Sequence, residues 1–280
     1  FAAEPDADER VRRATSGDAD LALDPPVGDM LSEAKNGTAE LRAWQPSLCV
    51  VFFISCGLPQ LRSPEVRRAI NLGVDVSAII REVMHGRARP INGPLSSRHL
   101  ACDGSIPPYP CDPEKASTLL KEAGYADGFD LEIHAPTSIP SEGPDLARAV
   151  AADLWKLGIR TQVILHENRR EYARRVAEKE IGGLLCFDSS PMSGYKVLHE
   201  KLESSFAGTW WQGYENGDFD ALLSRAAATP EPDARRRLYY QAYRMLHDDP
   251  PWLFLYNPDR IWAARHGSSI GIDDSGYLEV

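Results

Sequence analysis

The side chains best suited to bind a ligand follow a short apolar run in the second half of the chain. The segment "GGLLCFDSSP" has a strand-like run at 182–187, and Asp188, Ser189 and Ser190 come directly after it. A carboxylate and two hydroxyls there would emerge at the carboxyl edge of a sheet, where α/β proteins bind their ligands. Asp188 can also act as a turn residue that caps a helix in "MSGYKVLHEKL", so both roles stay open.

Aromatic side chains are concentrated in the last third of the chain, at Trp210, Trp211, Tyr214, Trp252, Tyr256 and Trp262. Such residues pack in cores more often than they bind ligands. The adjacent tryptophans in "GTWWQGY" would point to opposite faces of an extended strand. One of the two is therefore expected to face a cleft, a partner or water.

The search for catalytic and metal-binding motifs favours a protein that is not an enzyme. The chain has no H-E-x-x-H, G-x-G-x-x-G or Walker sequence. Its five cysteines include no C-x-x-C pair, and its seven histidines are scattered, so no zinc spacing occurs. We therefore expect no catalytic residues, no cofactor and no metal site.

Cys102 and Cys111 bracket the proline-rich loop "CDGSIPPYPC". A disulfide can close a loop of this length, and it would fit an oxidising compartment. The odd number of cysteines fits two free thiols, so both states stay open.

Composition and charge narrow the class of partner. The chain has 31 Lys and Arg against 41 Asp and Glu, and its formal net charge is -10. Nucleic acid is not an expected partner, because phosphate contacts need clustered positive charge. The longest apolar stretch, 48–56, is shorter than the ~18 residues that cross a bilayer, so we expect a soluble protein. The first residues lack a signal peptide's pattern and read as a mature fragment or one piece of a longer chain.

Helix and strand signals alternate through the middle of the chain. The stretch "SPEVRRAINLGVDVSAII" predicts a helix capped by Ser63 and a second helix capped by Asp75, and Asp112 is expected to cap the next helix. Arg67 and Arg68 fall on the polar face of the first helix and are expected to be solvated. The following segments predict a strand–helix–strand layer and hence an α/β fold: helices near 112–123, 144–157 and 171–179, and strands near 129–133, 159–165 and 182–187.

The two ends of the chain show other patterns. The last third predicts helices near 216–229 and 232–248, followed by strands within 250–265. Near the start, "RVRRATSGDADLALD" predicts a helix that stops at Gly17 and a strand with Leu21 and Leu23. That strand requires partner strands, which this chain need not contain.

Five separated blocks of the sequence resemble one family, the family 5 extracellular solute-binding proteins. In order along the chain they are "SPEVRRAINLGVD", "DPEKASTLLKEAGYADGFDLEIH", "LWKLGIRTQVIL", "YENGDFDALLSRA" and "RRRLYYQAYRMLHDDPPWLFLY". The resemblance extends from about residue 17 to the carboxyl end. Members of this family serve ABC importers of peptides, nickel and related solutes.

The resemblance implies a two-lobed fold of the periplasmic-binding-protein type (type II, Venus-flytrap) that closes on its solute by a hinge motion. By that pattern 1–57 is a remnant of lobe I, 58–187 forms an α/β lobe II, and 188–280 returns to lobe I. The amino-terminal part of lobe I that members carry is absent from the sequence, and a separate amino-terminal fragment would complete it. Cys49 and Cys186 would lie one on each crossing between lobes, as candidates for a hinge disulfide.

The function implied by the resemblance is that of the substrate-binding component of an ABC importer. It would capture a peptide or peptide-like solute and deliver it to a membrane permease. Asp188 matches an acidic position of the family's peptide binders, and we expect it to receive the solute's cationic group. Ser189 stands where peptide binders have an aromatic residue. The other expected cleft residues are Phe187, Ser190, Tyr195 and Trp210.

Two alternatives of the same family stay open. The solute can be a nickel or other metal chelate, or another small molecule, and the chain can be the solute-sensing domain of a regulator. The expected location is periplasmic or extracellular, with a lipid anchor in the missing amino-terminal part.

Overall fold

A computed structural model describes residues 3–4, 6–23, 39–189, 193–267, 270–272 and 278–279. The chain forms two compact units. Unit 1 combines residues 1–46 with 258–280, and unit 2 comprises residues 47–257.

Unit 2 is built on a six-stranded mixed sheet with the order β4-β8-β3-β7-β5-β6. Strand β3 is antiparallel to both β7 and β8, whereas β5 is parallel to β6 and β7. The predicted α/β layer is therefore present. The strands are β3 (Cys49–Ile54), β4 (Ala88–Pro90), β5 (Asp130–Pro136), β6 (Arg160–His166), β7 (Leu184–Ser189) and β8 (Trp252–Pro258).

The central strands of this sheet are buried along their whole length. Every residue of β3 and of β8 is buried, as both sequences consist mainly of large apolar side chains. Strands covered on both faces read as continuous apolar runs instead of an alternating pattern, so "CVVFFI" and "WLFLY" fit the middle of the sheet.

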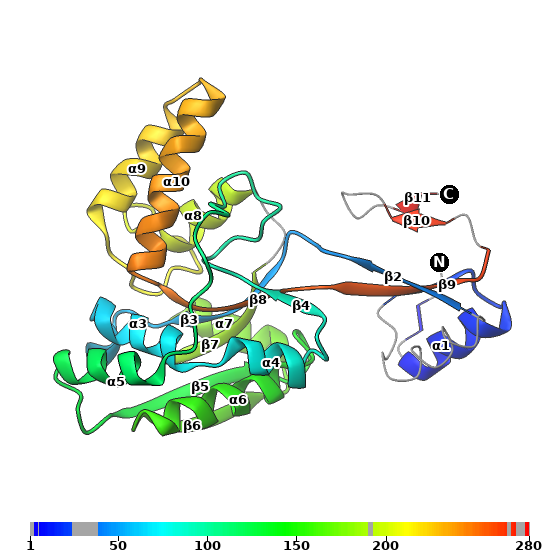
Figure 1. The fold of residues 1–280 in the computed structure, drawn as a ribbon, viewed down its shortest axis with the longest axis horizontal. Helices are drawn as coiled ribbons and strands as arrows, with labels where there is room; N and C mark the ends of the chain where they lie inside the picture. The colour runs from blue at the N-terminus through cyan, green and yellow to red at the C-terminus, as the bar shows by residue number, and fades with distance from the viewer. Residues whose placement is uncertain are drawn as a thin grey trace. The chain divides into compact units, whose positions relative to one another are not determined.

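Helices surround the sheet of unit 2. Helix α6 packs on β5 and β6, α3 packs on α5, and α9 with α10 forms the two-helix hairpin seen in Figure 1. The helices are η1 (Pro59–Leu61), α3 (Pro64–Gly73), α4 (Val76–Glu82), α5 (Pro113–Glu122), α6 (Gly143–Lys156), α7 (Arg169–Ala177), α8 (Gly194–Leu202), α9 (Gly217–Ala227) and α10 (Pro232–Asp248).

The helix starts are fixed by local capping. The side chains of Ser63, Asp75 and Asp112 accept hydrogen bonds from backbone N–H groups at the starts of α3, α4 and α5. This geometry satisfies donors that have no partner inside the helix. The sequence prediction of these three starts is confirmed.

Gly183 allows β7 to begin close to β5. Its φ is +116°, and a Cβ atom built on it would lie 2.2 Å from the carbonyl oxygen of Glu132. Only glycine adopts such a conformation without strain and leaves room for that oxygen. The position of β7, and of every residue that follows it in the strand, therefore depends on this glycine.

Arg67 is buried, although the helix pattern places it on the polar face. Only 4% of its side chain is exposed. The guanidinium pairs with Asp249 and donates hydrogen bonds to the backbone carbonyls of Leu61, Arg62 and Pro250. The prediction of a solvated Arg67 was wrong. The helical pattern contains no information about hydrogen-bond acceptors that other segments supply.

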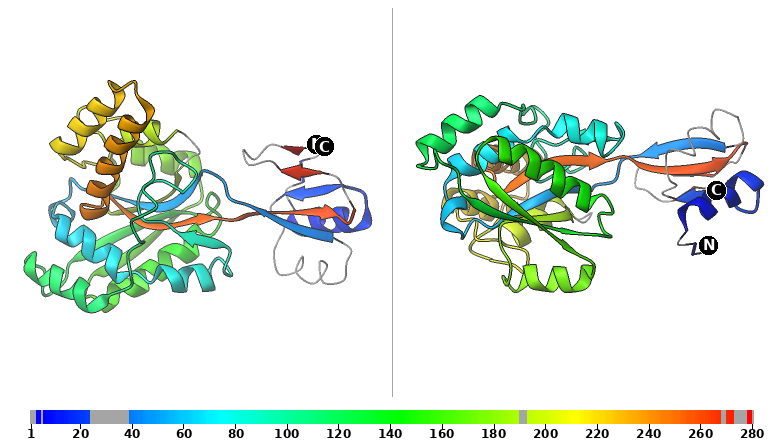
Figure 2. Two further views of the ribbon diagram at one scale, coloured as in Figure 1. Left: turned by 45° about the horizontal axis from the view of Figure 1, so that its top comes forward. Right: turned by 90° about the horizontal axis from the view of Figure 1, so that it is seen from below.

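Unit 1 contains a three-stranded antiparallel sheet with the order β1-β9-β2. Helix α1 (Ala7–Ser16) packs on β1 (Leu21–Leu23) and β9 (Arg260–Arg265), and Gly17 ends the helix with φ +87°. Figure 2 shows β9 beside β2 (Ala39–Trp44). The chain thus supplies the partner strand that β1 needs. Strands β10 (Gly271–Ile272) and β11 (Leu278–Glu279) form a separate pair.

The predicted lobe II, 58–187, is smaller than unit 2. Both of its boundaries fall within 47–257, where β3 pairs with β7 and β8 in one sheet. The assignment of residues to lobes stays a prediction.

Candidate functional site

Asp188 lies near the end of β7, at the carboxyl edge that β7 shares with β5 and β6. Its half-buried carboxylate faces Arg169, with 3.4 Å between Oδ1 and the guanidinium nitrogen Nη2. Arg169 is the first residue of α7, which follows β6 and is capped by the side chain of Asn168. The end of one strand and the start of the helix after another therefore place opposite charges at one edge of the sheet.

An aromatic cluster adjoins this ion pair. The ring of Phe187 stacks on those of Phe53 and Tyr172, each with 5.0 Å between centroids, and the edge of Trp210 approaches it at 5.4 Å. The guanidinium carbon of Arg169 lies 4.6 Å from the centroid of Phe187. A planar guanidinium is attracted to an aromatic face as well as to a carboxylate, so Arg169 is held by both.

Ser189, the last residue of β7, contacts a buried lysine. Nζ of Lys201 donates a hydrogen bond to the Ser189 hydroxyl over 3.2 Å and lies 5.7 Å from the ring centroid of Phe53 and 6.0 Å from that of Trp252. Burial lowers the pKa of Lys201 to about 8, and the nearby Asp188 carboxylate partly opposes this shift. The site thus holds a third charged group, behind the strand that carries Asp188.

The structure brings together some of the predicted site residues. Phe187, Asp188, Ser189 and Trp210 belong to one cluster, whereas Ser190 lies outside the described residues. Tyr195 belongs to α8, where its ring stacks on His199 at 5.1 Å. It lines a different pocket, of about 660 Å³, that includes Arg235 and Tyr239.

Sequence reasoning missed Arg169 and Lys201. Arg169 had a usable signal, because "HENRR" places an asparagine cap and an arginine directly after a strand that ends at the ligand-binding edge. Lys201 had none. A lysine directly before the last residue of a helix reads as solvated until the rings that cover it are known.

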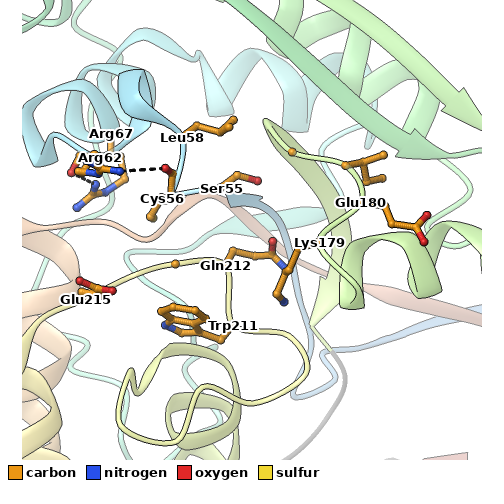
Figure 3. Close-up of a pocket in the computed structure, with 14 residues that line it drawn as sticks. Ser55, Cys56, Leu58, Arg62, Arg67, Lys179, Glu180, Trp211, Gln212 and Glu215 are labelled. Atoms are coloured by element: carbon orange, nitrogen blue, oxygen red, sulfur yellow. Dashed lines mark hydrogen bonds between the residues drawn. The ribbon is translucent and has the colours of Figure 1, made fainter.

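Another pocket, of about 820 Å³, lies at the other end of the β3–β7 pair and contains none of the predicted site residues. Figure 3 shows Arg62, Lys179, Trp211 and Gln212 around it. In this pair the carboxyl end of β3 meets the amino end of β7, whereas Asp188 lies at the opposite end. We place the candidate site at Asp188, because convergent charges and rings lie there.

Trp211 lines this pocket of about 820 Å³, as expected for one of the two adjacent tryptophans. The segment is a turn instead of a strand, however. The indole N–H of Trp211 donates to the carbonyl oxygen of Tyr214 over 2.7 Å, while Trp210 packs on the core.

All five cysteines are free thiols in the structure. Cys49 lies opposite Ser189 in the β3–β7 register and Cys186 lies opposite Phe52, an offset of three residues along β7. At ~3.3 Å per residue the two are about 10 Å apart, beyond the ~7 Å that a disulfide spans. A hinge disulfide between Cys49 and Cys186 is incompatible with this register, and a bond between Cys102 and Cys111 stays a prediction.

Three further features concern metal binding, membrane spans and a catalytic serine motif. Within the described residues no group of three or more His, Cys, Asp and Glu can hold a metal ion, and no helix there could span a membrane. The spacing G-x-S-x-G occurs in "GSSIG" at 267–271, between strands β9 and β10. A nucleophile elbow joins a strand to a helix, so this context does not fit one. Ser269 itself lies outside the described residues.

Comparison with known families decides the classification. A family model described as "Bacterial extracellular solute-binding proteins, family 5 Middle" matches residues 1–245. The chain belongs to this family. The resemblance noted in the five sequence blocks is therefore confirmed.

Family 5 relatives with similar sequences are named as binding proteins. Heme-binding protein A of Haemophilus influenzae is 31% identical over 255 residues, which cover 89% of this chain and 46% of that protein. Di/tripeptide-binding protein 2 of Pseudomonas aeruginosa is 28% identical over 268 residues, which cover 94% and 50%. The chain thus spans about half the length of these relatives.

Solved family 5 structures share the fold. The periplasmic binding protein DppA of Helicobacter pylori, solved with the peptide STSA, is 21% identical and superposes with a TM-score of 0.82 over 99% of this chain and 56% of that chain. The prediction of a periplasmic-binding-protein-like α/β fold is confirmed.

Proposed function

We propose that this chain provides the solute-binding site of the substrate-binding component of an ABC importer, with a peptide or peptide-like molecule as its solute. The proposal rests mainly on one observation, the half-buried ion pair between Asp188 and Arg169 on the aromatic cluster around Phe187. Membership of family 5, and a relative named for di- and tripeptides, support it.

The ion pair favours a solute that carries both charges. At 3.4 Å the contact between Asp188 and Arg169 is long for a charge-assisted hydrogen bond, which has its optimum near ~2.8 Å. A zwitterion can replace it with two shorter contacts, its ammonium group on Asp188 and its carboxylate on Arg169. Apolar side chains of the solute would then lie against Trp210, whose ring is only partly buried.

The remaining parts of the proposal follow from the family. The solute is gripped between two lobes that close on it, with boundaries near 57/58 and 187/188, and is passed to a membrane permease. A separate amino-terminal fragment would complete lobe I, and the protein would act in the periplasm or outside the cell, held by a lipid anchor. Relatives named as binding proteins support a role without catalysis.

A metal chelate is the second candidate solute. A relative named for haem, at 31% identity, favours it. The partly buried ring of Trp210 also suits a flat ligand. A regulator that senses solute would use the same site, and it differs from a transport protein only in its partner.

Calorimetric titration with trialanine tests the proposal, using the protein expressed from its complete reading frame. Asp188→Asn keeps the shape of the side chain and removes its charge, so we expect the affinity to fall at least about tenfold. Asp130→Asn is the matched control, because Asp130 pairs with Arg160 at the amino end of β5, away from the site. Equal affinity of the Asp188→Asn variant and the unmodified protein would remove Asp188 from the site.

A further inference from the structure

A carboxylate and two imidazoles form a continuous hydrogen-bonded chain under α7. Oε2 of Glu132 lies 3.0 Å from Nε2 of His134, and Nδ1 of His134 lies 3.0 Å from Nε2 of His166. Glu132 and His134 belong to β5, and His166 ends the neighbouring parallel strand β6. Only 2% of the His134 side chain is exposed, whereas 52% of Glu132 is exposed.

The direction of the hydrogen bonds in the series Glu132–His134–His166 follows from which groups can donate. An ionised carboxylate only accepts, so Nε2 of His134 carries the proton that Glu132 receives. Nδ1 of neutral His134 is then an acceptor, and Nε2 of His166 must donate to it. Nδ1 of neutral His166 is therefore left with a lone pair. Within the described residues this nitrogen has no hydrogen-bond partner.

His166 lies at the same sheet edge as the candidate site. Its ring stacks on Tyr172 with 4.7 Å between centroids, and Tyr172 stacks in turn on Phe187. The backbone carbonyl of His166 accepts a hydrogen bond from Thr137 N–H, and Arg169 donates to the carbonyl of Ile139, so one connection after β5 contacts both residues. His166 itself is half-buried, which leaves it reachable by a solute.

We propose that His166 accepts a hydrogen bond from the solute through Nδ1, and that Glu132 and His134 are positioning residues that hold it in this tautomer. The inference rests on the proposed function and extends it. The solute carries a second N–H or ammonium donor besides the group that Asp188 receives, and its capture requires neutral His166.

Burial is the main reason that the neutral form of both rings is favoured. Burial lowers the pKa of His134, although Glu132 opposes this, and burial and the neighbouring His134 lower that of His166. Arg175 of α7 lowers both pKa values further. The other charged groups near the stack are Arg169 of α7, whose guanidinium lies 5.8 Å from the ring centroid of Tyr172, and its partner Asp188 of β7. Acid therefore adds a proton at Nδ1 of His166 and removes the acceptor.

Nuclear magnetic resonance of histidine side chains tests the chain of tautomers without any solute. In the ¹⁵N-labelled protein expressed from its complete reading frame, both His134 and His166 should carry their proton on Nε2 at pH 7. In Glu132→Lys the ammonium can only donate, so both rings should move to the Nδ1–H tautomer. A wild-type His166 with its proton on Nδ1 would overturn the inference.

Titration with trialanine tests the contact itself. His166→Phe keeps a ring that stacks on Tyr172 but removes the acceptor nitrogen. Glu132→Lys changes the tautomer of His166, so that its Nδ1 donates instead of accepting. Each should lower the affinity at pH 7 about tenfold, the effect of one lost charge-assisted hydrogen bond. Glu167→Lys is the control, because it makes the same change of charge at an exposed side chain one residue from His166. It should change the affinity for trialanine less than threefold.

Two results separate the inference from the proposed function. Wild-type affinity should fall between pH 7 and pH 5, and His166→Phe should abolish that dependence. If trialanine binds, and if His166→Phe changes neither the affinity for trialanine nor the pH dependence of that affinity, the proposed hydrogen bond to Nδ1 of His166 is wrong. The proposed function then still stands. If wild-type protein binds neither trialanine nor a dipeptide panel, the peptide function fails and the contact fails with it, whereas the spectra still decide the tautomers.

Discussion

The buried guanidinium of Arg67 and the half-buried carboxylate of Asp249 form an ion pair that joins the first half of α3 to the residue after α10. The same guanidinium satisfies three backbone carbonyls, so it organises the junction between α3 and the strand that follows α10. Arg67→Met should lower the free energy of unfolding by about 3–5 kcal/mol, since it removes the cation that pairs with Asp249 and the donor to three backbone carbonyls. Urea denaturation followed by circular dichroism measures this.

Arg81→Met is the control for that substitution. Arg81 pairs with Glu82, and 67% of its side chain is exposed. Its loss should change the free energy of unfolding by less than about 0.5 kcal/mol. Similar losses in the two variants would show that the buried contacts of Arg67 contribute little.

Stability should fall in mild acid because of the pair His134 and His166. Both have pKa values below the ordinary 6.5 in the folded state, so the unfolded chain takes up their protons first. Their contribution is complete above pH 6.5 and is lost as the pH falls below it, by at most about 1.4 kcal/mol per pH unit for each proton. Denaturation at pH 7.5, 6.5 and 5.5 measures the slope.

The double variant His134→Phe/His166→Phe provides the comparison. It retains two aromatic rings and removes both titrating groups. Its free energy of unfolding should vary less with pH over this range than that of the wild type. A slope equal to that of the wild type would assign the acid sensitivity to other groups.

Lys201 should destabilise the fold at neutral pH. Its ammonium is buried over the rings of Phe53 and Trp252, and its folded pKa of about 8 is below the ordinary 10.5. The unfolded chain holds this proton more tightly, so stability should rise with pH between about 8 and the ordinary pKa of 10.5. Lys201→Met should increase the free energy of unfolding at pH 7 by about 1–3 kcal/mol and remove that rise.

The neighbouring Lys196 gives a matched control on the same helix. More than half of its side chain is exposed, so Lys196→Met should leave both the stability and its pH dependence nearly unchanged. If Lys201→Met were destabilising, the hydrogen bond to Ser189 would outweigh the cost of burying the charge.

Gly183→Ala should strain the start of β7. The new methyl group would meet the carbonyl oxygen of Glu132, and φ of +116° is unfavourable for alanine. We expect a loss of about 2–4 kcal/mol in thermal or urea denaturation. Gly57→Ala meets no atom within 4 Å and should cost less than about 1 kcal/mol.

Local sequence signals predicted much of the fold. The caps at Ser63, Asp75 and Asp112 and the strand–helix–strand layer were found, because each depends on residues close together in the chain. The predicted strand 182–187 in fact continues to Ser189, since β3 pairs with it as far as Cys49. Asp188 therefore belongs to a strand and not to the turn after it.

The charged partners in the site could not be predicted in the same way. The guanidinium of Arg169 and the ammonium of Lys201 come from helices before and after β7, and their burial depends on rings supplied by β3, α7 and β8. Such contacts are set by tertiary packing. A charged residue on a helix has the same local pattern whether a ring covers it or water does.

The order β1-β9-β2 has a consequence for synthesis on the ribosome. β1 and β2 pair with β9 and not with each other, and β9 comes from residues 260–265. The two early strands therefore emerge long before their shared partner, while the whole of 47–257 is still being made. Unit 1 can complete its sheet only once residues 260–265 have left the ribosome, so its assembly follows the synthesis of 47–257.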